Sequence, residues 1–285
     1  MKITVLISTY NRPDALDAVL SGFHHQSGML AGDWEIIVAD DGSGPATQAV
    51  VKAHQKIFHD RLQHVWHEDL GFRLAEIRNR AALQARGDYL IFLDGDCIPQ
   101  SDFLFQHAKL AERGWVVAGN RVLMSERFTL SYVSGECRPV SNWTGFSWLA
   151  HRLRKNINNF LGWLRLDLPK WRKKRKDSWK LLRGCNIGVW REDYLMVDGF
   201  DATFSGWGYE DSDFAVRLIR SGVGIKNGRF AMPVLHLWHK ENDRSFEGEN
   251  WRRFEASIRS EHVKALKGIS SLDIDPGWLS NGKSE

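Results

Sequence analysis

The feature that most constrains the fold is a regular alternation of apolar β-type runs and helical stretches over the first 120 residues. The runs recur about every 30 residues, and amphipathic stretches lie between them. This alternation is typical of βαβ units, which build an α/β fold with an open, mostly parallel sheet flanked by helices. The expected strands are residues 2–8, 35–39, 62–66, 89–93 and 115–119, and the expected helices begin near Pro13, Pro45, Leu74 and Asp102.

Polar residues gather directly after three of the expected strands, at residues 8–12, 40–43 and 94–96. In open α/β sheets, ligands bind at the carboxyl ends of the strands. The sequence therefore predicts one ligand-binding cleft at this edge of the sheet. Neither a GxGxxG nor a GxxxxGK[ST] motif is present, which argues against the usual dinucleotide-binding and P-loop classes.

Two short motifs offer ligands for a metal ion. Asp94 and Asp96 flank a glycine after a fully apolar strand, and hard divalent ions prefer such carboxylate oxygens. His236 and His239, three residues apart, fit together on one turn, and a mixed aspartate and histidine site suits Mn²⁺ better than Mg²⁺. Standing alone, the first motif is more often a polar loop with a turn glycine, and a histidine pair is more often structural.

A third motif, Gly206-Trp207-Gly208-Tyr209-Glu210-Asp211, places two adjacent acids after a turn rich in glycine and tryptophan. An acid at this position could act as a general base on a hydroxyl group. The alternative is that the acids only complement the dipole at the start of the helix expected over residues 211–221. Arg78 allows two readings as well, as a ligand of a pyrophosphate or as part of a solvated helix face.

Together these residues resemble the inverting family 2 glycosyltransferases, which have the GT-A fold, a Rossmann-like sheet. The N-terminal motifs of the resemblance are residues 7–12, 38–43, 78–79 and 93–96. Residues 206–211, His236 and His239 resemble the C-terminal segment of β-1,4-galactosyltransferases and chondroitin-type polymerases. Four motifs in the right order make the resemblance specific.

The resemblance implies a metal-dependent, inverting transfer of a sugar from a UDP-sugar to a hydroxyl of a glycan or glycolipid acceptor. It implies that Asp211 is the catalytic base, that Asp96, His236 and His239 hold Mn²⁺ or Mg²⁺, that Thr9, Arg12, Asp40, Arg78, Asp94 and Gly95 bind the nucleotide sugar, and that Trp207, Glu210 and Asn186 line the acceptor subsite. The expected context is the synthesis of a bacterial surface polysaccharide or lipopolysaccharide.

Two other function classes fit parts of the pattern. A sugar-nucleotide nucleotidyltransferase normally carries a glycine-rich N-terminal loop with a basic residue, and no such loop is present. A non-catalytic carbohydrate-binding or membrane-docked module predicts degraded acids at the site, whereas Asp94, Asp96, Glu210 and Asp211 are intact.

One GT-A domain in two halves is expected. Residues 1–125 form the nucleotide-sugar-binding half, and residues 126–270 form the acceptor-binding half. The second half includes a helical, basic amphipathic insert at residues 150–182, and residues 271–285 are expected to be a flexible tail. A final helix is expected over residues 249–266 and a strand over residues 230–238.

The insert dominates the charge distribution of the chain. Residues 151–183 contain 12 lysines and arginines and only 2 aspartates, although the whole chain has a net charge of +4. A basic, apolar-interleaved segment favours an anionic membrane surface; a solvated face is the alternative, and no nucleic-acid partner is expected because no nucleic-acid module accompanies it.

The sequence also predicts where the protein works. The 3 cysteines lie far apart without a CxxC motif, which indicates a reducing compartment. No apolar run approaches the roughly 20 residues of a membrane span, and the N-terminus lacks the pattern of a signal peptide. We therefore expect a cytoplasmic protein that is peripheral at the inner face of the cytoplasmic membrane.

Overall fold

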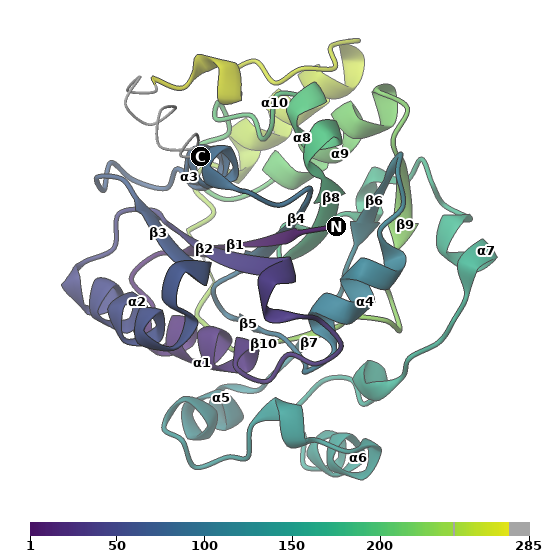
Figure 1. Cartoon of the computed structure of the whole chain (residues 1–285). Helices are drawn as coiled ribbons and strands as arrows, with labels where there is room; N and C mark the ends of the chain where they lie inside the picture. Colours follow the sequence, from purple (N-terminus) through teal and green to yellow (C-terminus); the bar gives the residue numbers. More distant parts are fainter. Residues whose placement is uncertain (242, 274–285) are drawn as a thin grey trace.

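A seven-stranded sheet forms the centre of the computed structural model, which describes residues 1–241 and 243–273 (Figure 1). The strand order is β3-β2-β1-β4-β8-β6-β9. The strands are β1 (Ile3–Thr9), β2 (Trp34–Asp40), β3 (Leu62–Trp66), β4 (Tyr89–Asp94), β6 (Trp115–Ala118), β8 (Asn186–Trp190) and β9 (Gly224–Asn227).

All five strands expected from the sequence are present, and they run in the same direction. β8 is the antiparallel member of this sheet, because it pairs antiparallel with both β4 and β6. Every residue of β1, β2 and β8 is buried, as expected for strands covered on both faces. The sheet is thus the mostly parallel α/β sheet that the sequence predicts.

Helices cover both faces of this sheet (Figure 1). α1 (Pro13–Phe23), α2 (Pro45–Phe58) and α4 (Phe103–Leu110) pack on one face. α3 (Leu74–Gln84), α8 (Arg191–Met196) and α9 (Glu210–Arg220) pack on the other, and α10 (Glu247–Arg259) packs against α9. Pro13 and Pro45 occupy the first turns of α1 and α2, where the missing N–H costs no hydrogen bond.

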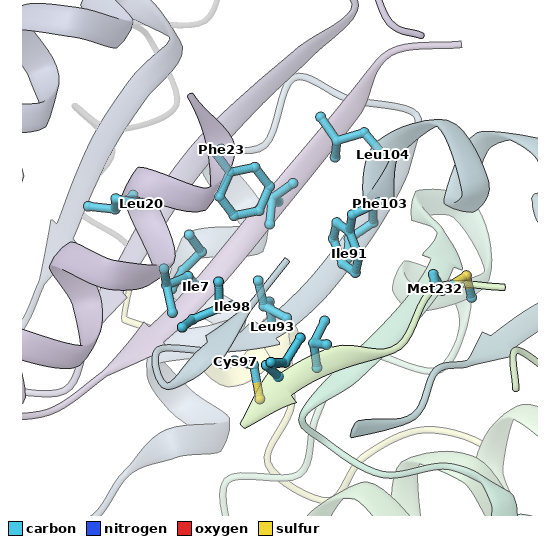
Figure 2. Packing of buried hydrophobic residues seen from close by; sticks show 14 of the residues in the cluster. Ile7, Leu20, Phe23, Ile91, Leu93, Cys97, Ile98, Phe103, Leu104 and Met232 are labelled. Atoms are coloured by element: carbon cyan, nitrogen blue, oxygen red, sulfur yellow. The ribbon is translucent and has the colours of Figure 1, made fainter. Parts of the chain in front are cut away.

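A second, three-stranded sheet lies at the carboxyl ends of β1 and β4, in the order β5 (Cys97–Ile98), β10 (Val234–His236) and β7 (Arg121–Leu123). In Figure 2, Cys97 and Ile98 lie beside Ile7 and Leu93 in the core. β10 pairs antiparallel with β5, so that His236 lies opposite Cys97. The strand expected over residues 230–238 is therefore shorter, and its role is to carry His236 to the segment that contains Asp96.

The basic insert at residues 150–182, expected to be helical with an interruption at Pro169, is helical in short pieces. It contains the end of α6 (Gly145–Leu153) and the short α7 (Pro169–Lys173), joined by irregular chain. The buried Arg172 guanidinium donates hydrogen bonds to the carbonyls of Leu166, Asn227 and Arg229, and so ties the segment to the end of β9. Pro169 prevents one continuous helix, and this buried arginine favours the packed conformation instead.

α5 (Glu126–Val133) precedes α6, and the two helices lie at one end of the molecule (Figure 1). The last α-helix ends at Arg259, earlier than expected, and the chain from Ser260 to residue 273 is irregular except for a 3₁₀ turn at Ile269–Ser271. Ile269 is buried, and Ser270 hydrogen-bonds to Asp198, which fixes the chain up to the expected tail. Residues 274–285 of that tail lie outside the described residues.

Among residues 1–241 and 243–273, no helix combines the length and the apolar character needed to cross a bilayer.

Candidate active site

The polar strand ends meet at the carboxyl edge of the large sheet, next to the small sheet. Asp94 is the last residue of β4, and Gly95 donates a backbone hydrogen bond of 2.7 Å to the carbonyl of Ser8 at the end of β1. A Cβ atom on Gly95 would lie 2.6 Å from that carbonyl oxygen. Gly95 is therefore required by this close approach, which holds Asp94 and Asp96 at the edge of the sheet.

Asp96, His236 and His239 converge in space from segments about 140 residues apart in the sequence. The Asp96 carboxylate oxygens lie 3.6 Å from His236 Nε2 and 3.3 Å from His239 Nε2. His239 Nδ1 is 2.6 Å from the Lys240 carbonyl, which can only accept, so Nδ1 donates to it and Nε2 is the ring nitrogen that faces Asp96. The backbone N–H of Trp238 donates to Thr129 Oγ1 of α5, which fixes the loop between the two histidines.

The three side chains fit a divalent ion. Their ligand atoms lie within 4.8 Å of one another, and cis ligands of an octahedral ion with bonds near 2.1 Å lie about 3 Å apart. Desolvation lowers the pKa of His236, which favours the neutral imidazole that a metal ion requires. One carboxylate and two imidazoles would leave further positions open for the oxygens of a substrate.

Arg78 lies at the centre of a second charged cluster. It is fully buried on α3, and it donates to Ser8 Oγ (3.1 Å), Asp94 Oδ1 (2.9 Å) and the Gly184 carbonyl (3.3 Å). Its Nη1 atom lies 3.6 Å from Glu210 Oε1. Three hydrogen bonds thus hold the guanidinium within the protein, while Nη1 has no hydrogen-bond partner among the described residues. These bonds favour a positioning role for Arg78, and its contact with a pyrophosphate stays a prediction.

Glu210 and Asp211 form the first turn of α9. Desolvation and the neighbouring Asp211 raise the pKa of Glu210 to about 7, against the opposing effect of Arg78. Asp211 is half-buried, and its Oδ2 accepts a hydrogen bond of 2.8 Å from the backbone N–H of Gly184. Tyr209, directly before them, has a φ of 71°, a left-handed conformation that costs energy outside glycine. This strained start of the helix orients both acids.

The residues predicted to bind the nucleotide sugar near the ends of β1 and β2 differ in whether their polar atoms are already paired within the protein. Asp40 is buried, with one carboxylate oxygen bonded to Ser43 N–H and the other 2.9 Å from His64 Nε2. The buried Thr9 hydroxyl has no hydrogen-bond partner among the described residues, while Arg12 is half-exposed beside Asp14. Thr9 and Arg12 thus keep polar atoms for a ligand, whereas Asp40 is already paired within the protein.

Asn186 does not belong to an acceptor subsite. It is fully buried in β8, where its amide contacts His107 Nε2 at 3.0 Å and donates to the Met232 carbonyl at 2.9 Å. The expectation came from the position of Asn186 near the acceptor region of the resembled family. The structure corrects it, because both polar atoms of the side chain serve the interior of the sheet.

The surface beside Trp207 contains residues that the sequence did not single out. The Arg244 guanidinium stacks 4.8 Å from the ring centre of Trp207, and a shallow groove of about 510 Å³ is lined by Tyr209, Arg244, Glu247, Gly248 and Trp251. The buried Asn250 of α10 holds the Trp207 loop through the carbonyls of Ser205 and Trp207. The aromatic residues of the 246–254 stretch were the available signal for this groove.

Arg121 of β7 is a further residue that the sequence did not single out. It is exposed, and although desolvation acts to lower the pKa of its guanidinium, the nearby Cys185, Cys97, Asp94 and Asp96 raise it overall. The site thus has a positive side chain at its small-sheet edge. Only the pairing of β7 with β10 brings Arg121 there, so no local sequence signal could have shown it.

Comparison with known proteins agrees with this geometry. Residues 4–180 match the sequence family described as Glycosyl transferase family 2. The chain belongs to this family. Residues 166–240 also match the family described as N-terminal domain of galactosyltransferase, a range that includes Trp207, Asp211, His236 and His239.

Curated relatives of this family 2 glycosyltransferase are longer than the chain. Validoxylamine A glucosyltransferase of Streptomyces hygroscopicus is 28% identical over 80% of this chain and 53% of its own length. Chondroitin synthase of Escherichia coli is 26% identical over 84% of this chain and 34% of its own length. The chain therefore spans about half of the first relative and a third of the second.

Solved structures confirm the GT-A fold. The mannosyltransferase PcManGT of Pyrobaculum calidifontis, in complex with GDP-Man and Mn²⁺, matches with a TM-score of 0.59 and 19% identity over 91% of this chain and 64% of its own. S. aureus TarS 1–349 in complex with UDP matches with a TM-score of 0.58 and 15% identity over 98% of this chain and 68% of its own.

Proposed function

We propose that this glycosyltransferase moves a sugar from a UDP-sugar to a hydroxyl group of a glycan or glycolipid acceptor, with inversion at the anomeric carbon. The observation that carries the proposal is the convergence of Asp96, His236 and His239 at the strand ends where GT-A folds bind ligands, with Asp211 at the start of the neighbouring α9. The names of the relatives, chondroitin and hyaluronan synthases among them, support a polysaccharide context, as in bacterial surface polysaccharide or lipopolysaccharide.

Asp96, His236 and His239 would hold Mn²⁺ or Mg²⁺. A divalent ion bound there would supply Lewis-acid chemistry for the charge of a leaving diphosphate. The chain itself prepares the site: the Lys240 carbonyl orients His239, and Gly95 permits the close backbone approach that presents Asp96. Thr9, Arg12 and Arg121 would contact the nucleotide sugar directly, while Arg78, Asp40 and Gly95 position the surrounding backbone.

Asp211 would accept the proton of the attacking hydroxyl. Its Oδ2 is held by Gly184 N–H and its Oδ1 lies 3.2 Å from the Ser212 hydroxyl, so the carboxylate has a fixed direction. Trp207 and Glu210 would shape the acceptor subsite next to it. A correctly placed base typically contributes about 10²–10⁴-fold to the rate.

The direct test measures donor and reaction together. A thermal-shift screen of UDP-sugars and GDP-sugars, each with Mn²⁺, identifies the donor by the stabilisation that a bound ligand adds. Transfer to oligosaccharide acceptors then follows by product NMR, which reads the anomeric configuration. We expect a UDP-sugar to stabilise the protein and the product to be inverted; stabilisation by GDP-sugars alone, or a retained configuration, contradicts the proposal.

We also propose that the basic insert contacts an anionic membrane surface and holds the protein at the inner face of the cytoplasmic membrane. Lys174, Arg175 and Lys176 are exposed, as are Arg152 and Arg154, so these charges are available to lipid phosphates. Lys173 is engaged with Glu112 and Arg165 with Asp102, so part of the charge of the insert serves the fold. Flotation with vesicles containing phosphatidylglycerol tests this association, which should weaken with salt.

A further inference from the structure

Residues 137–166 contain no aspartate or glutamate but five arginines and lysines, and they include α6. Thr144 and Ser147 form a capping box that starts α6 at Gly145. The buried Trp148 anchors the inner side of this helix. An amphipathic helix of a globular protein usually turns its apolar face toward the core.

The structure instead leaves an apolar face of α6 in solvent. Phe146, Leu149 and Leu153, at spacings of three and four residues, are 81%, 41% and 74% exposed. Trp163 is half-exposed and lies against the start of the helix, since a Cβ on Gly145 would be 3.3 Å from its ring. We call Phe146, Leu149, Leu153 and Trp163 the α6 face.

The charges beside this face decide what can cover it. Arg152, Arg154 and Lys155 are exposed at the end of α6, and none forms an ion pair within residues 1–241 and 243–273. A second copy of the chain seated on the same face would bring like charges together. An anionic bilayer takes up both features, because acyl chains accept the apolar side chains and lipid phosphates accept the cations.

We propose that the α6 face is the surface through which this protein docks on an anionic membrane, with Phe146, Leu149, Leu153 and Trp163 inserted at the headgroup level. This rests on the membrane association proposed above and assigns its main contact to α6, with the exposed cations of residues 174–176 adding a smaller part. It does not depend on the transfer chemistry.

Two contacts connect helix α6 to the loop that carries His236 and His239. His151 of α6 packs on Phe128 of α5, with ring centres 4.7 Å apart. Thr129, the next residue of α5, accepts the hydrogen bond from Trp238 N–H between His236 and His239. α5 and α6 lie at the same end of the molecule as the small sheet (Figure 1). Docking on α6 therefore brings the site close to the membrane, where a glycolipid acceptor would be presented.

The experiment is flotation of the whole chain with phosphatidylethanolamine vesicles, with and without phosphatidylglycerol. The test variants are Phe146→Ser/Leu153→Ser and Arg152→Gln/Arg154→Gln. The matched controls are Leu266→Ser, which changes a leucine 72% exposed elsewhere, and Lys174→Gln/Arg175→Gln, which removes two charges from the basic tract. Thermal shift with a UDP-sugar confirms folding and donor binding in each variant.

We expect both α6 variants to lower binding to phosphatidylglycerol vesicles about tenfold or more. Arg152→Gln/Arg154→Gln removes two basic residues, each of which contributes about fivefold near an anionic surface. Phe146→Ser/Leu153→Ser removes two apolar side chains that would be buried at the headgroup level. The two control variants should keep most of the vesicle binding, and the thermal shift with the UDP-sugar should be unchanged in all variants. If the Lys174 and Arg175 control alone abolishes flotation, the assignment to α6 is wrong while membrane association stands. If wild type does not float, both fail, and the proposed sugar transfer is untouched. A dimer in solution that Phe146→Ser/Leu153→Ser converts to a monomer overturns the proposal in favour of a protein interface.

Discussion

Two charged clusters meet near the end of β4, and they are built in opposite ways. Around Arg78 the charges are already compensated, since the guanidinium bonds to Ser8, Asp94 and the Gly184 carbonyl and lies beside Glu210. Around Asp96 the Nε2 atoms of two imidazoles lie 3.3 and 3.6 Å from the carboxylate oxygens. Most polar atoms of the first cluster are paired within the protein, with Arg78 Nη1 as an exception, whereas those of the second cluster are not. Two acids only two residues apart, Asp94 and Asp96, therefore have different surroundings.

Of the four variants compared, Asp211→Asn should have the largest effect. Asp211 accepts a hydrogen bond from Gly184 N–H, and the Gly184 carbonyl accepts one from Arg78, so Asp211 borders the Arg78 cluster from the first turn of α9. We expect Asp211→Asn to lower the transfer rate about 10²–10⁴-fold while donor affinity is kept, since the amide cannot accept a proton. Steady-state transfer kinetics and donor titration measure the two effects. Asp177→Asn, at an exposed position, is the control. Near-normal turnover in Asp211→Asn would show that Asp211 is not the base.

Arg78→Met tests whether the first cluster is structural. Removing the cation leaves Asp94 and Glu210 facing each other uncompensated, which should cost about 3–5 kcal/mol of unfolding free energy. Urea denaturation measures it, and the Arg78→Met/Glu210→Gln double variant should recover part of the loss. Arg12→Met, at a half-exposed ion pair, should change stability by at most about 1 kcal/mol. An equal loss of unfolding free energy in Arg78→Met and Arg12→Met would show that the Arg78 cluster is no more structural than a surface ion pair.

Asp96→Asn tests whether the second cluster is a ligand site. We expect the stabilisation by Mn²⁺ to disappear, a loss of about 2.7 kcal/mol when wild type is measured at a hundredfold excess over Kd. Stability without Mn²⁺ should change little, because Asp96 has no strong hydrogen-bond donor of its own. Thermal shift with and without Mn²⁺ gives both values, and His25→Asn serves as a histidine control outside the site. Unchanged Mn²⁺ stabilisation in Asp96→Asn contradicts the metal assignment.

Glu210→Gln gives a smaller, pH-dependent effect. The pKa of Glu210 is raised to about 7 in the folded protein, so between about pH 4.5 and 7 the folded state binds more protons than the unfolded state. The unfolding free energy of wild type should therefore fall with rising pH across this window, by on the order of 2 kcal/mol from this group. Glu210→Gln should lack that fall. Parallel pH profiles of the two proteins in urea denaturation would mean that Glu210 stays ionised throughout.

Local sequence patterns were sufficient for most of the first half of the fold. The strands from β1 to β4 and the helices from α1 to α3 follow the predicted ranges closely, because each is encoded by a periodicity within its own residues. β8 was missed because its five residues, Asn186 to Trp190, include a glycine and only three apolar side chains. Its place between β4 and β6 depends on pairing partners that lie far away in the chain.

The candidate site divides in the same way. The types of residue at Asp96, His236, His239 and Asp211 indicated the chemistry, and the fold brings the first three of them together. Arg78 and Asn186 were assigned to ligands by resemblance, yet both are buried and bonded within the protein. The sequence carries no local sign of this difference, because the partners Ser8, Gly184 and Met232 come from other elements.

The sequence alone determined the alternation of strands and helices and the acids at the strand ends, since periodicity and turn chemistry act between near neighbours. Only the tertiary structure decided which charged side chains are paired inside the protein and which stay available to a ligand, because burial and pairing join residues far apart in the chain. It also decided that Leu149 and Leu153 face solvent, because the helix had already turned Trp148 inward to the core.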